Sequence, residues 1–409
     1  MDDVLIVGAG PAGLYLGVLL LQAGLTVKIL EKRNSPRTHS RAIGIHPPGL
    51  SALDLAGVSE ALAAEGLHIS NGAARSGGKL VAGLRFSGIT NGPPFILSIP
   101  QARTEEFLEA RVHALDPQAL LRGVTVHSLH DDGTQVTLRA SLNAGDTGGM
   151  VPVPSVLNAG DTDAGENPMV FSASLLIGAD GAYSTVRREL GIPTRGRNYP
   201  DTYLMGDFPD AGDDGPTAVL HLEPGGIVES FPMPGQLRRW VVHTDTLLSS
   251  ASAADLAALI HTRTGVSVAA EANSMLSAFP VSARLALRMV QGRTALIGDA
   301  AHQISPIGGQ GLTLGWLDAA ALAPIIVAAL RGEETALRLK EFEQVRMAAA
   351  TRASRQASIN MALGRPLPRT LLRRRNAVLG GVIRVPWLAD AVARRFTMQS
   401  PRPVRVQSG

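Results

Sequence analysis

"VLIVGAGPAGLYLGVLLLQAGLTVKILEKR", residues 4–33, is the stretch that decides the fold. Val4–Val7 reads as a short buried strand, and the apolar run Leu14–Gln22 as a helix that stops at Gly24. Val27–Leu30 reads as a second strand. A strand, a tight turn, a helix and a second strand form the βαβ unit that opens a Rossmann-like α/β domain.

The turn between the first strand and the helix carries the pattern Gly-x-Gly-x-x-Gly. Its glycines permit the sharp turn, the approach of a pyrophosphate and the close packing of helix on strand, in that order. The helix start then offers free N–H groups to phosphates. Glu31 follows the second strand, where an acid accepts hydrogen bonds from ribose hydroxyls. An adenine dinucleotide, FAD or NAD, is therefore predicted to contact Gly8, Gly10, Pro11, Ala12, Gly13 and Glu31.

Composition excludes several other classes of protein. The chain has 409 residues, 45% of them hydrophobic, and a net charge of only +3, which argues against a dedicated nucleic-acid binder. It has no cysteine, which excludes disulfides, iron–sulfur clusters and cysteine nucleophiles. Its 10 histidines are scattered and no HExxH occurs, so no metal site is predicted.

The start of the chain and its most apolar stretch were compared with targeting and membrane segments. The start is acidic, and Gly-Pro-Ala-Gly interrupts its apolar run, which is not the pattern of a signal peptide. The apolar stretch Ala319–Leu330 is shorter than the roughly 20 residues that span a bilayer. A cytoplasmic protein is the expectation.

Two later motifs favour a flavin. "LLIGADGAYSTVRREL", residues 175–190, reads as strand, Asp180-Gly181 turn and short helix. "GDAAHQISPIGGQGLTLG", residues 298–315, follows the strand Thr294–Ile297 and places Asp299 at its carboxyl end, where ligands bind in open α/β sheets. Its glycines would let the backbone pass close to a flat ligand. The helix that begins near Leu312 would direct its N-terminal dipole at negative charge, which a reduced flavin carries.

The three motifs together resemble the group A flavin-dependent monooxygenases, the p-hydroxybenzoate hydroxylase type. They occur in the family's order, as GxGxxG at 8–13, "GADGAYSTVR" at 178–187 and "GDAAHQISPIGGQG" at 298–311. The resemblance implies a GR2-type FAD-binding domain with an inserted antiparallel-sheet substrate domain and C-terminal helices. It also implies FAD as the cofactor and NADPH or NADH as the electron donor. The implied reaction is hydroxylation or epoxidation of an aromatic or polyketide/quinone-like molecule by O₂, through a flavin C4a-hydroperoxide.

The resemblance also assigns residues to the cofactor. The glycine motif and Glu31 hold the ADP half, Arg41 lies near the pyrophosphate and flavin, and Gln101 contacts the ribityl region. The family often has Asn where this chain has Thr313, near the flavin pyrimidine edge. The other cofactor-binding residues expected are Lys32, Arg33, Asp180, Gly181, Asp299, Pro306, Gly308, Gly309, Gln310, Gly311 and Leu312.

Short strand-like runs with Gly/Pro turns between 195 and 285 predict the antiparallel wall of a substrate pocket, with a helix near 253–265 packed on it. The expected FAD-binding domain is discontinuous and covers 1–76, 101–190 and 286–360. The substrate domain covers 77–100 and 191–285, and 361–409 forms a C-terminal helical segment.

The substrate and its pocket are less specified than the cofactor site. Candidate pocket walls are Met205, Phe231 and Trp240, although a place in the ordinary core is the favoured interpretation of each. Candidate bases are His221 and Asp207, but either could face solvent or satisfy a turn, so no catalytic residue is assigned. His302 is expected to pack beside the glycine motif. The expected partners are an aromatic or lipophilic small molecule and O₂, and the expected assembly is a monomer or homodimer.

Two segments outside the motifs are interpreted as structural. Residues 141–168 contain "LNAGDT" twice and are rich in Gly, Pro and Asp, which is typical of a long exposed hairpin tip. The arginine-rich C-terminus is interpreted as terminal helices, with a membrane-surface face as the less favoured alternative.

Other functions stay open. A reductase of the geranylgeranyl-reductase kind would share the FAD motifs, and a non-catalytic FAD-binding protein is the alternative from a different class. A flavin halogenase is disfavoured because its WxWxIP motif is absent.

Overall fold

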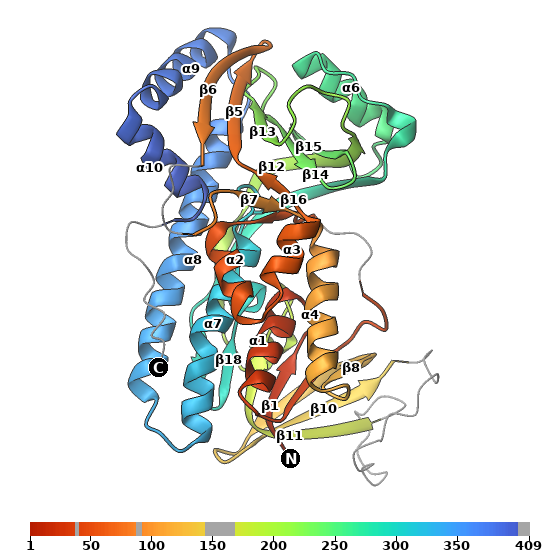
Figure 1. Cartoon of the computed structure of the whole chain (residues 1–409). Helices are drawn as coiled ribbons and strands as arrows, with labels where there is room; N and C mark the ends of the chain where they lie inside the picture. The colour runs from red at the N-terminus through yellow and green to blue at the C-terminus, as the bar shows by residue number, and fades with distance from the viewer. Residues whose placement is uncertain (37–40, 87–91, 144–167, 400–409) are drawn as a thin grey trace.

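The computed structural model describes residues 1–36, 41–86, 92–143 and 168–399. The repeated "LNAGDT" segment predicted as a hairpin tip lies almost entirely outside the described residues. The chain forms a lower α/β layer and an upper antiparallel sheet, joined along one side by a long helix (Figure 1).

The first sheet is the Rossmann-like one. Its strands run in the order β17-β18-β11-β1-β2-β8, and β1 pairs in parallel with both β2 and β11. The antiparallel strands β9 and β10 extend it through β11. The bounds are β1 Asp2–Val7, β2 Val27–Glu31, β8 Leu120–Arg122, β9 Val124–Asp131, β10 Val136–Leu142, β11 Pro168–Gly178, β17 Val290–Gln291 and β18 Thr294–Leu296.

Helices cover this sheet. In Figure 1, α1 lies between α4 and α7, and it contacts both. The N-terminal helices are α1 Pro11–Gln22, α2 Pro47–Leu55, α3 Ser59–Glu65, α4 Gln101–Leu115 and the short α5 Thr185–Glu189. The main core contains the fully buried apolar residues of β1, β2 and α1 together with the buried face of α7.

The helix α7, Gly311–Leu330, is longer than the apolar stretch seen in the sequence and is long and apolar enough to cross a membrane. In this structure 61% of its apolar 18-residue stretch is buried inside the protein. Because α7 contacts α1, α2 and α8, we interpret it as a core helix.

The second sheet is antiparallel apart from one parallel pair, β5 with β13. Its order is β19-β16-β12-β15-β14-β13-β5-β6. The bounds are β5 Asn71–Ser76, β6 Lys79–Arg85, β12 Thr194–Pro209, β13 Thr217–His221, β14 Val228–Met233, β15 Leu237–Thr244, β16 Met275–Ala286 and β19 His302–Gln303. The strand β5 therefore belongs to the second sheet, whereas the predicted domain boundary places residues 71–76 with the FAD-binding domain.

The two faces of this sheet pack against different elements. Leu204, Trp240 and Val242 pack under α6, Ala253–Thr264. Side chains on the opposite face, including Met205 and Val241, pack with Ile307 of the glycine loop, which we define as residues 304–310. We call this face the loop-facing side of the sheet.

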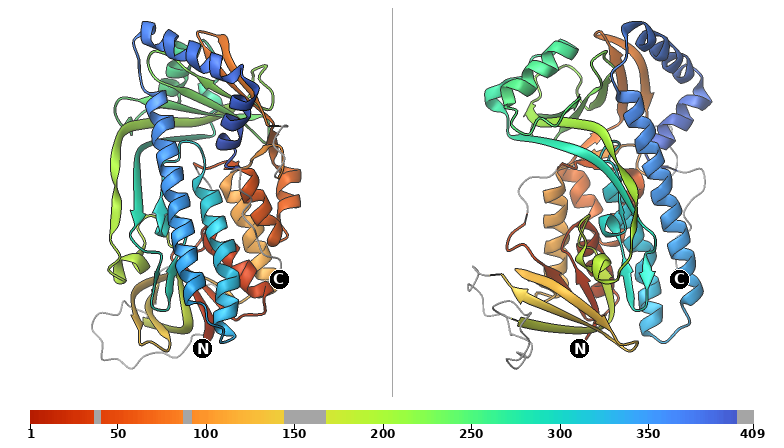
Figure 2. Two further views of the ribbon diagram at one scale, coloured as in Figure 1. Left: turned by 90° about the vertical axis from the view of Figure 1, so that its left-hand side faces the viewer. Right: turned by 180° about the vertical axis from the view of Figure 1, so that it is seen from behind.

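Three further helices complete the chain. The helix α8, Ala336–Gly364, runs from the bottom of the lower layer up to the second sheet, as both views in Figure 2 show. The helices α9, Arg369–Ile383, and α10, Pro386–Phe396, follow, and both contact β6. The remaining short elements are the small sheet β3 Gly44–Ile45, β7 Ile96–Ser98 and β4 Leu67–Ile69, and the 3₁₀ turns η1 Ala270–Ala272 and η2 Gly298–Ala300.

Candidate active site

The three motifs meet at one edge of the parallel sheet. The glycine turn follows β1, Asp180 follows β11, and Asp299 follows β18. Because β1, β11 and β18 are adjacent and parallel, their carboxyl ends bring the motifs together.

Glycines let the motifs interlock. A Cβ atom on Gly8 would come within 2.4 Å of the Ala179 carbonyl oxygen, so only glycine fits beside the second motif. A Cβ on Gly13 would come within 2.0 Å of the Gly8 carbonyl oxygen. The Ala12 methyl packs against the third motif, because it would lie 3.3 Å from a Cβ on Gly298.

The residues present fit a bound dinucleotide. The helix α1 starts after Gly10 with no side-chain cap and no acid in its first turn, so its first amides are free for an anion. A Cβ built on Gly10 meets no protein atom within 4 Å, so space is open beside this backbone. The helix α7 likewise starts without a side-chain cap or an acid in its first turn.

Glu31 is buried where the ribose acid was predicted. Its carboxylate accepts hydrogen bonds from the Ala9 N–H, 2.9 Å, and from the Arg33 N–H and Nε, 2.9 and 2.8 Å. Burial raises the pKa of this carboxyl, but the hydrogen bonds from Arg33 and Ala9 outweigh it, so the net pKa is lowered. The neighbouring Lys32 side chain is exposed.

Asp180 caps a helix in the second motif. Its carboxylate accepts from the Thr185 and Val186 amides, at 2.6 and 3.1 Å, and from the Ser184 hydroxyl. Arg187 then donates to the Ala300 carbonyl oxygen at 2.6 Å, which ties the second motif to the third.

Asp299 is exposed at the end of β18 yet closely surrounded by protein. Desolvation raises the pKa of its carboxyl, and the nearby His302 opposes the shift.

The glycine loop is held from behind by a histidine that the sequence did not single out. Gly308 and Gly309 have φ values of +100° and +66°, which favour glycine. His46 is buried, and its Nε2 lies 3.0 Å from the Gly308 carbonyl oxygen, so this nitrogen is the donor. Burial lowers the pKa of His46 to about 4, which keeps the ring neutral near pH 7.

Two assigned cofactor residues, Thr313 and Arg41, contact elements other than the glycine turn. Thr313 is fully buried, and a Cβ on Gly49 would come within 2.8 Å of its hydroxyl oxygen, so this hydroxyl lies beside α2. The Arg41 guanidinium donates to the Ser277 hydroxyl at 3.2 Å and lies 5.1 Å from the centre of the Phe279 ring. Arg41 thus contacts β16 of the second sheet.

The remaining predicted cofactor residues lie at helix starts and in the glycine loop. Gln101 opens α4, and its side chain donates to Glu105 at 2.7 Å. Gln310 is the N-cap residue of α7, Gly311 and Leu312 begin that helix, and Pro306 is exposed in the loop.

A buried charge network braces the third motif. The Asp318 carboxylate accepts from Arg346 Nε at 2.6 Å and from the Gly298 N–H at 3.0 Å, and His302 Nε2 lies 2.5 Å from it. Burial would raise the pKa of Asp318, but His302 and Arg346 reverse the shift and lower it. His302 is therefore packed beside the motif as predicted, and Asp318 and Arg346 had no sequence signal.

The substrate candidates separate onto two faces of the sheet. Met205 and Phe231 lie on the loop-facing side. Trp240 lies under α6, and His221 stacks on it with ring centres 5.8 Å apart. The alternation of side chains along β13 and β15 therefore directs this pair away from the glycine loop.

The two candidate bases have no free basic atom at the loop-facing side. Asp207 forms a buried two-point ion pair with Arg239, with both contacts at 2.7 Å. Burial, the largest cause, lowers the pKa of His221 to about 4. Glu229, which the sequence analysis did not select, is the buried carboxyl that the loop-facing side presents between Leu220 and Val241.

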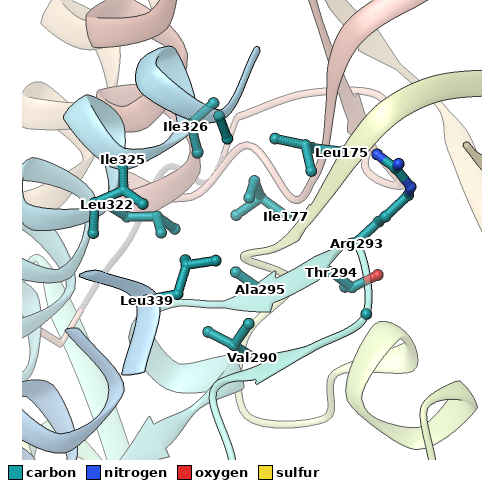
Figure 3. Close-up of a pocket in the computed structure, with 12 residues that line it drawn as sticks. Leu175, Ile177, Val290, Arg293, Thr294, Ala295, Leu322, Ile325, Ile326 and Leu339 are labelled. Carbon is teal, nitrogen blue, oxygen red and sulfur yellow. The ribbon is translucent and has the colours of Figure 1, made fainter. Parts of the chain in front are cut away.

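An apolar hollow lies behind the parallel sheet, away from the glycine loop. Leu322, Ile325 and Ile326 of α7 face Ile177 of β11 and Ala295 of β18 across it (Figure 3). Its lining offers little polar chemistry, so we interpret it as a gap in core packing. The described residues contain no group of three or more His, Cys, Asp or Glu that could hold a metal ion.

Comparisons with known proteins agree with this site. A family model described as "FAD binding domain" matches residues 1–357. The chain is 30% identical over 381 residues to 12-dehydrotetracycline 5-monooxygenase/anhydrotetracycline 6-monooxygenase of Streptomyces rimosus, covering 90% of this chain and 71% of that relative. It is also 30% identical to the uncharacterized aromatic compound monooxygenase YhjG of Bacillus subtilis, covering 85% of this chain and 66% of the relative.

Solved structures share the fold. The OxyS anhydrotetracycline hydroxylase from Streptomyces rimosus superposes with a TM-score of 0.76 at 28% identity, covering 98% of this chain and 76% of that one. The p-nitrophenol 4-monooxygenase PnpA from Pseudomonas putida DLL-E4 gives a TM-score of 0.84 over 98% of this chain and 99% of that one. At 23% identity, this second likeness speaks for the fold alone.

The interlocked motifs and the two-sheet architecture define a flavoprotein hydroxylase of the GR2 type. The chain belongs to the FAD-binding-domain family and is an FAD-dependent monooxygenase of the p-hydroxybenzoate hydroxylase type. The predicted family, fold class and cofactor are confirmed, and NAD(P)H is the usual electron donor of this family.

Proposed function

We propose that the chain hydroxylates a multi-ring phenol or hydroxyquinone held between the glycine loop and the loop-facing side of the second sheet. The observation that carries this proposal is the apolar face formed by Met205, Phe231 and Phe279, which packs with Ile307 of the loop. Relatives named for tetracycline and pretetramide substrates support a polyketide-like ring system.

FAD, when bound, would supply the redox chemistry by accepting a hydride from NAD(P)H and reducing O₂. The protein's own groups would hold it. Glu31 and the α1 start would bind the adenosine and pyrophosphate, and Asp299 would meet the sugar-like chain. The α7 start would stabilise negative charge on the reduced ring.

The loop-facing side would orient the substrate and exclude water. Its aromatic and thioether side chains would stack against flat rings. Arg239, which is paired with Asp207, also donates a 2.6 Å hydrogen bond to the Arg41 carbonyl oxygen and so holds the backbone at Arg41. An apolar wall beside the reacting ring also keeps water away from the reacting groups.

Turnover with labelled oxygen tests this proposal. The FAD-loaded protein would be mixed with NADPH or NADH, ¹⁸O₂ and a panel of phenols and hydroxyquinones. The expected result is substrate-stimulated NAD(P)H oxidation with one ¹⁸O atom in the product. A product that has gained hydrogen and no oxygen would establish a reductase instead. The absence of any stimulation by the panel would refute the proposed substrate class.

We further propose a cytoplasmic protein that acts as a monomer or homodimer. No membrane contact is needed in this proposal, because the apolar faces that it uses lie inside the molecule. Sedimentation of the FAD-loaded protein would measure its assembly state, and the same experiment with anionic vesicles would detect any membrane contact.

A further inference from the structure

Glu229 lies in the middle of the loop-facing side of the sheet. It pairs across the strands with Leu220 on β13 and with Val241 on β15, and Val241 pairs in turn with Met205 on β12. Directly paired residues share a face, so the four side chains form one row. Strands lie about 4.8 Å apart, which puts Glu229 roughly 10 Å from Met205 along the sheet.

The carboxyl of Glu229 is buried and unpaired. The residue is 8% exposed, and within the described part of the chain no hydrogen-bond or charge partner influences its pKa. Desolvation alone raises the pKa of Glu229 to about 7. The Tyr203 hydroxyl, two strands away on the same face, also finds no partner among the described residues.

Other charged and titratable groups on this face already have partners or lie at its edge. On β15 and β12, Arg239 is paired with Asp207 in the next row, and His243 lies 3.3 Å from Asp201. The charge of Glu229 and the burial of Tyr203 together raise the pKa of that tyrosine, burial being the larger cause. The titratable groups that share this face with Glu229 are Tyr203 and Asp207 on β12 and Arg239 and His243 on β15.

A structural role does not account for this carboxyl. A buried acid that makes neither an ion pair nor a hydrogen bond destabilises the fold when it ionises. A leucine or methionine would pack as well between Leu220 and Val241. A desolvated acid on the face that receives the substrate, titrating close to neutral pH, has instead the properties of a general base.

We infer, resting on the function proposed above, that Glu229 is the catalytic base that accepts the phenolic proton of the substrate. The phenolic O–H bond breaks, and the proton forms a new O–H bond on the Glu229 carboxylate. The electron pair left on the phenolic oxygen enters the ring and drives formation of the new C–O bond at the ortho or para carbon. One atom of O₂ enters this bond, the other leaves as water with electrons from NAD(P)H, and loss of the ring C–H proton restores aromaticity.

The inference narrows the substrate class. The substrate carries a free phenolic hydroxyl that reaches Glu229, while the ring to be hydroxylated lies nearer the glycine loop. Because the residues paired directly with Glu229, Leu220 and Val241, are apolar, this position favours a neutral phenol over a carboxylated one. A phenol methyl ether would bind this surface without being activated.

The test compares wild-type protein with Glu229→Gln, which keeps the size of the side chain but cannot accept a proton. Glu223→Gln is the matched control, because Glu223 is also a buried acid of this domain but is bound to the Gly77 N–H at 2.8 Å. The first readout is binding of 1,4-dihydroxyanthraquinone to the FAD-loaded proteins across pH 5.5–8.5. Its visible spectrum reports ionisation of the phenol. The second readout is the pH profile of hydroxylation in a single turnover.

The expected result is a bound-phenol spectrum that shifts with an apparent pKa near 7 in wild type and Glu223→Gln, and no such shift in Glu229→Gln. Hydroxylation by Glu229→Gln should fall by about 10²–10⁴-fold and lose the step near pH 7. Unchanged spectra and rates in a variant that still binds FAD would overturn the inference. If wild type binds the dye with the shift but transfers no oxygen to any phenol, the proposed function fails and the assignment of Glu229 as a phenol-binding base survives.

Discussion

Replacing Glu229 by glutamine should stabilise the folded protein at pH 8 and leave its stability near pH 4 almost unchanged. Burial raises the pKa of this carboxyl from 4.5 to about 7. At about 1.4 kcal/mol for each pKa unit, ionising Glu229 in the folded state costs roughly 3 kcal/mol.

The sign follows from proton binding. Between pH 4.5 and 7 the folded protein keeps a proton that the unfolded chain has released, so the free energy of unfolding falls as the pH rises through this window. Above about pH 7 the full cost is present in wild type and absent from the amide variant. Below pH 4.5 the wild-type carboxyl is neutral in both states and resembles the amide.

Urea unfolding of the FAD-loaded proteins at pH 8 and pH 5 measures the effect, because other titrating groups contribute equally to both proteins. Glu271→Gln, which changes an exposed acid of the same domain, is the control and should shift stability by only a few tenths of a kcal/mol at either pH. A Glu229→Gln protein that is less stable than wild type at pH 8 would refute the reasoning. So would a stability difference that does not change with pH, since the carboxyl would then have an ionic partner.

Three further predictions follow from the packing of the motifs and the sheet. Gly10→Ala should fold with nearly wild-type stability yet bind FAD far more weakly in a fluorescence titration. Gly13→Ala should lose several kcal/mol of folding stability even without FAD, because its Cβ would meet the Gly8 carbonyl oxygen at 2.0 Å. Equal stability of the two apoproteins would contradict this account. Asp318→Leu should destabilise the protein by about 3–5 kcal/mol in thermal unfolding, because it leaves the buried Arg346 without its anionic partner. Adding Arg346→Met should recover part of the lost stability. A double variant as unstable as the sum of the two single changes would count against the network. Phe231→Ala should raise the substrate KM about 10-fold or more in steady-state kinetics. Trp240→Phe changes a side chain under α6 and should alter the folding stability but not the KM. The reverse pattern would place the substrate on the other face of the sheet.

The parts of this molecule that the sequence predicted are those set by local chemistry. The βαβ unit was predicted within a few residues because alternating apolar runs and positional glycines specify strand, turn and helix over short distances. Asp180 and Asp299 could be placed at strand ends for the same reason. The order of the motifs along the chain then pointed to the family.

Residues whose roles depend on a distant segment were not predictable. His46 bonds to Gly308, 262 positions away, and Asp318 bonds to Arg346 on another helix. The Thr313 hydroxyl lies beside Gly49 of α2, a contact between distant positions that the glycine motif does not reveal.

The sequence by itself therefore determined the dinucleotide fold, because that fold depends on backbone conformations that particular residues permit within one turn. The flavin and the monooxygenase reaction were indicated by the resemblance of the three motifs to a family, and the comparisons then confirmed them. Only the tertiary structure decided which face of the second sheet meets the glycine loop. A strand alternates its side chains between two faces, and the sequence shows the alternation without showing which face is covered by α6. In the folded protein, Trp240 and His221 lie on the face that α6 covers, away from the glycine loop. On the loop-facing side, Asp207 is paired with Arg239, and Glu229 is a buried carboxyl without a compensating charge.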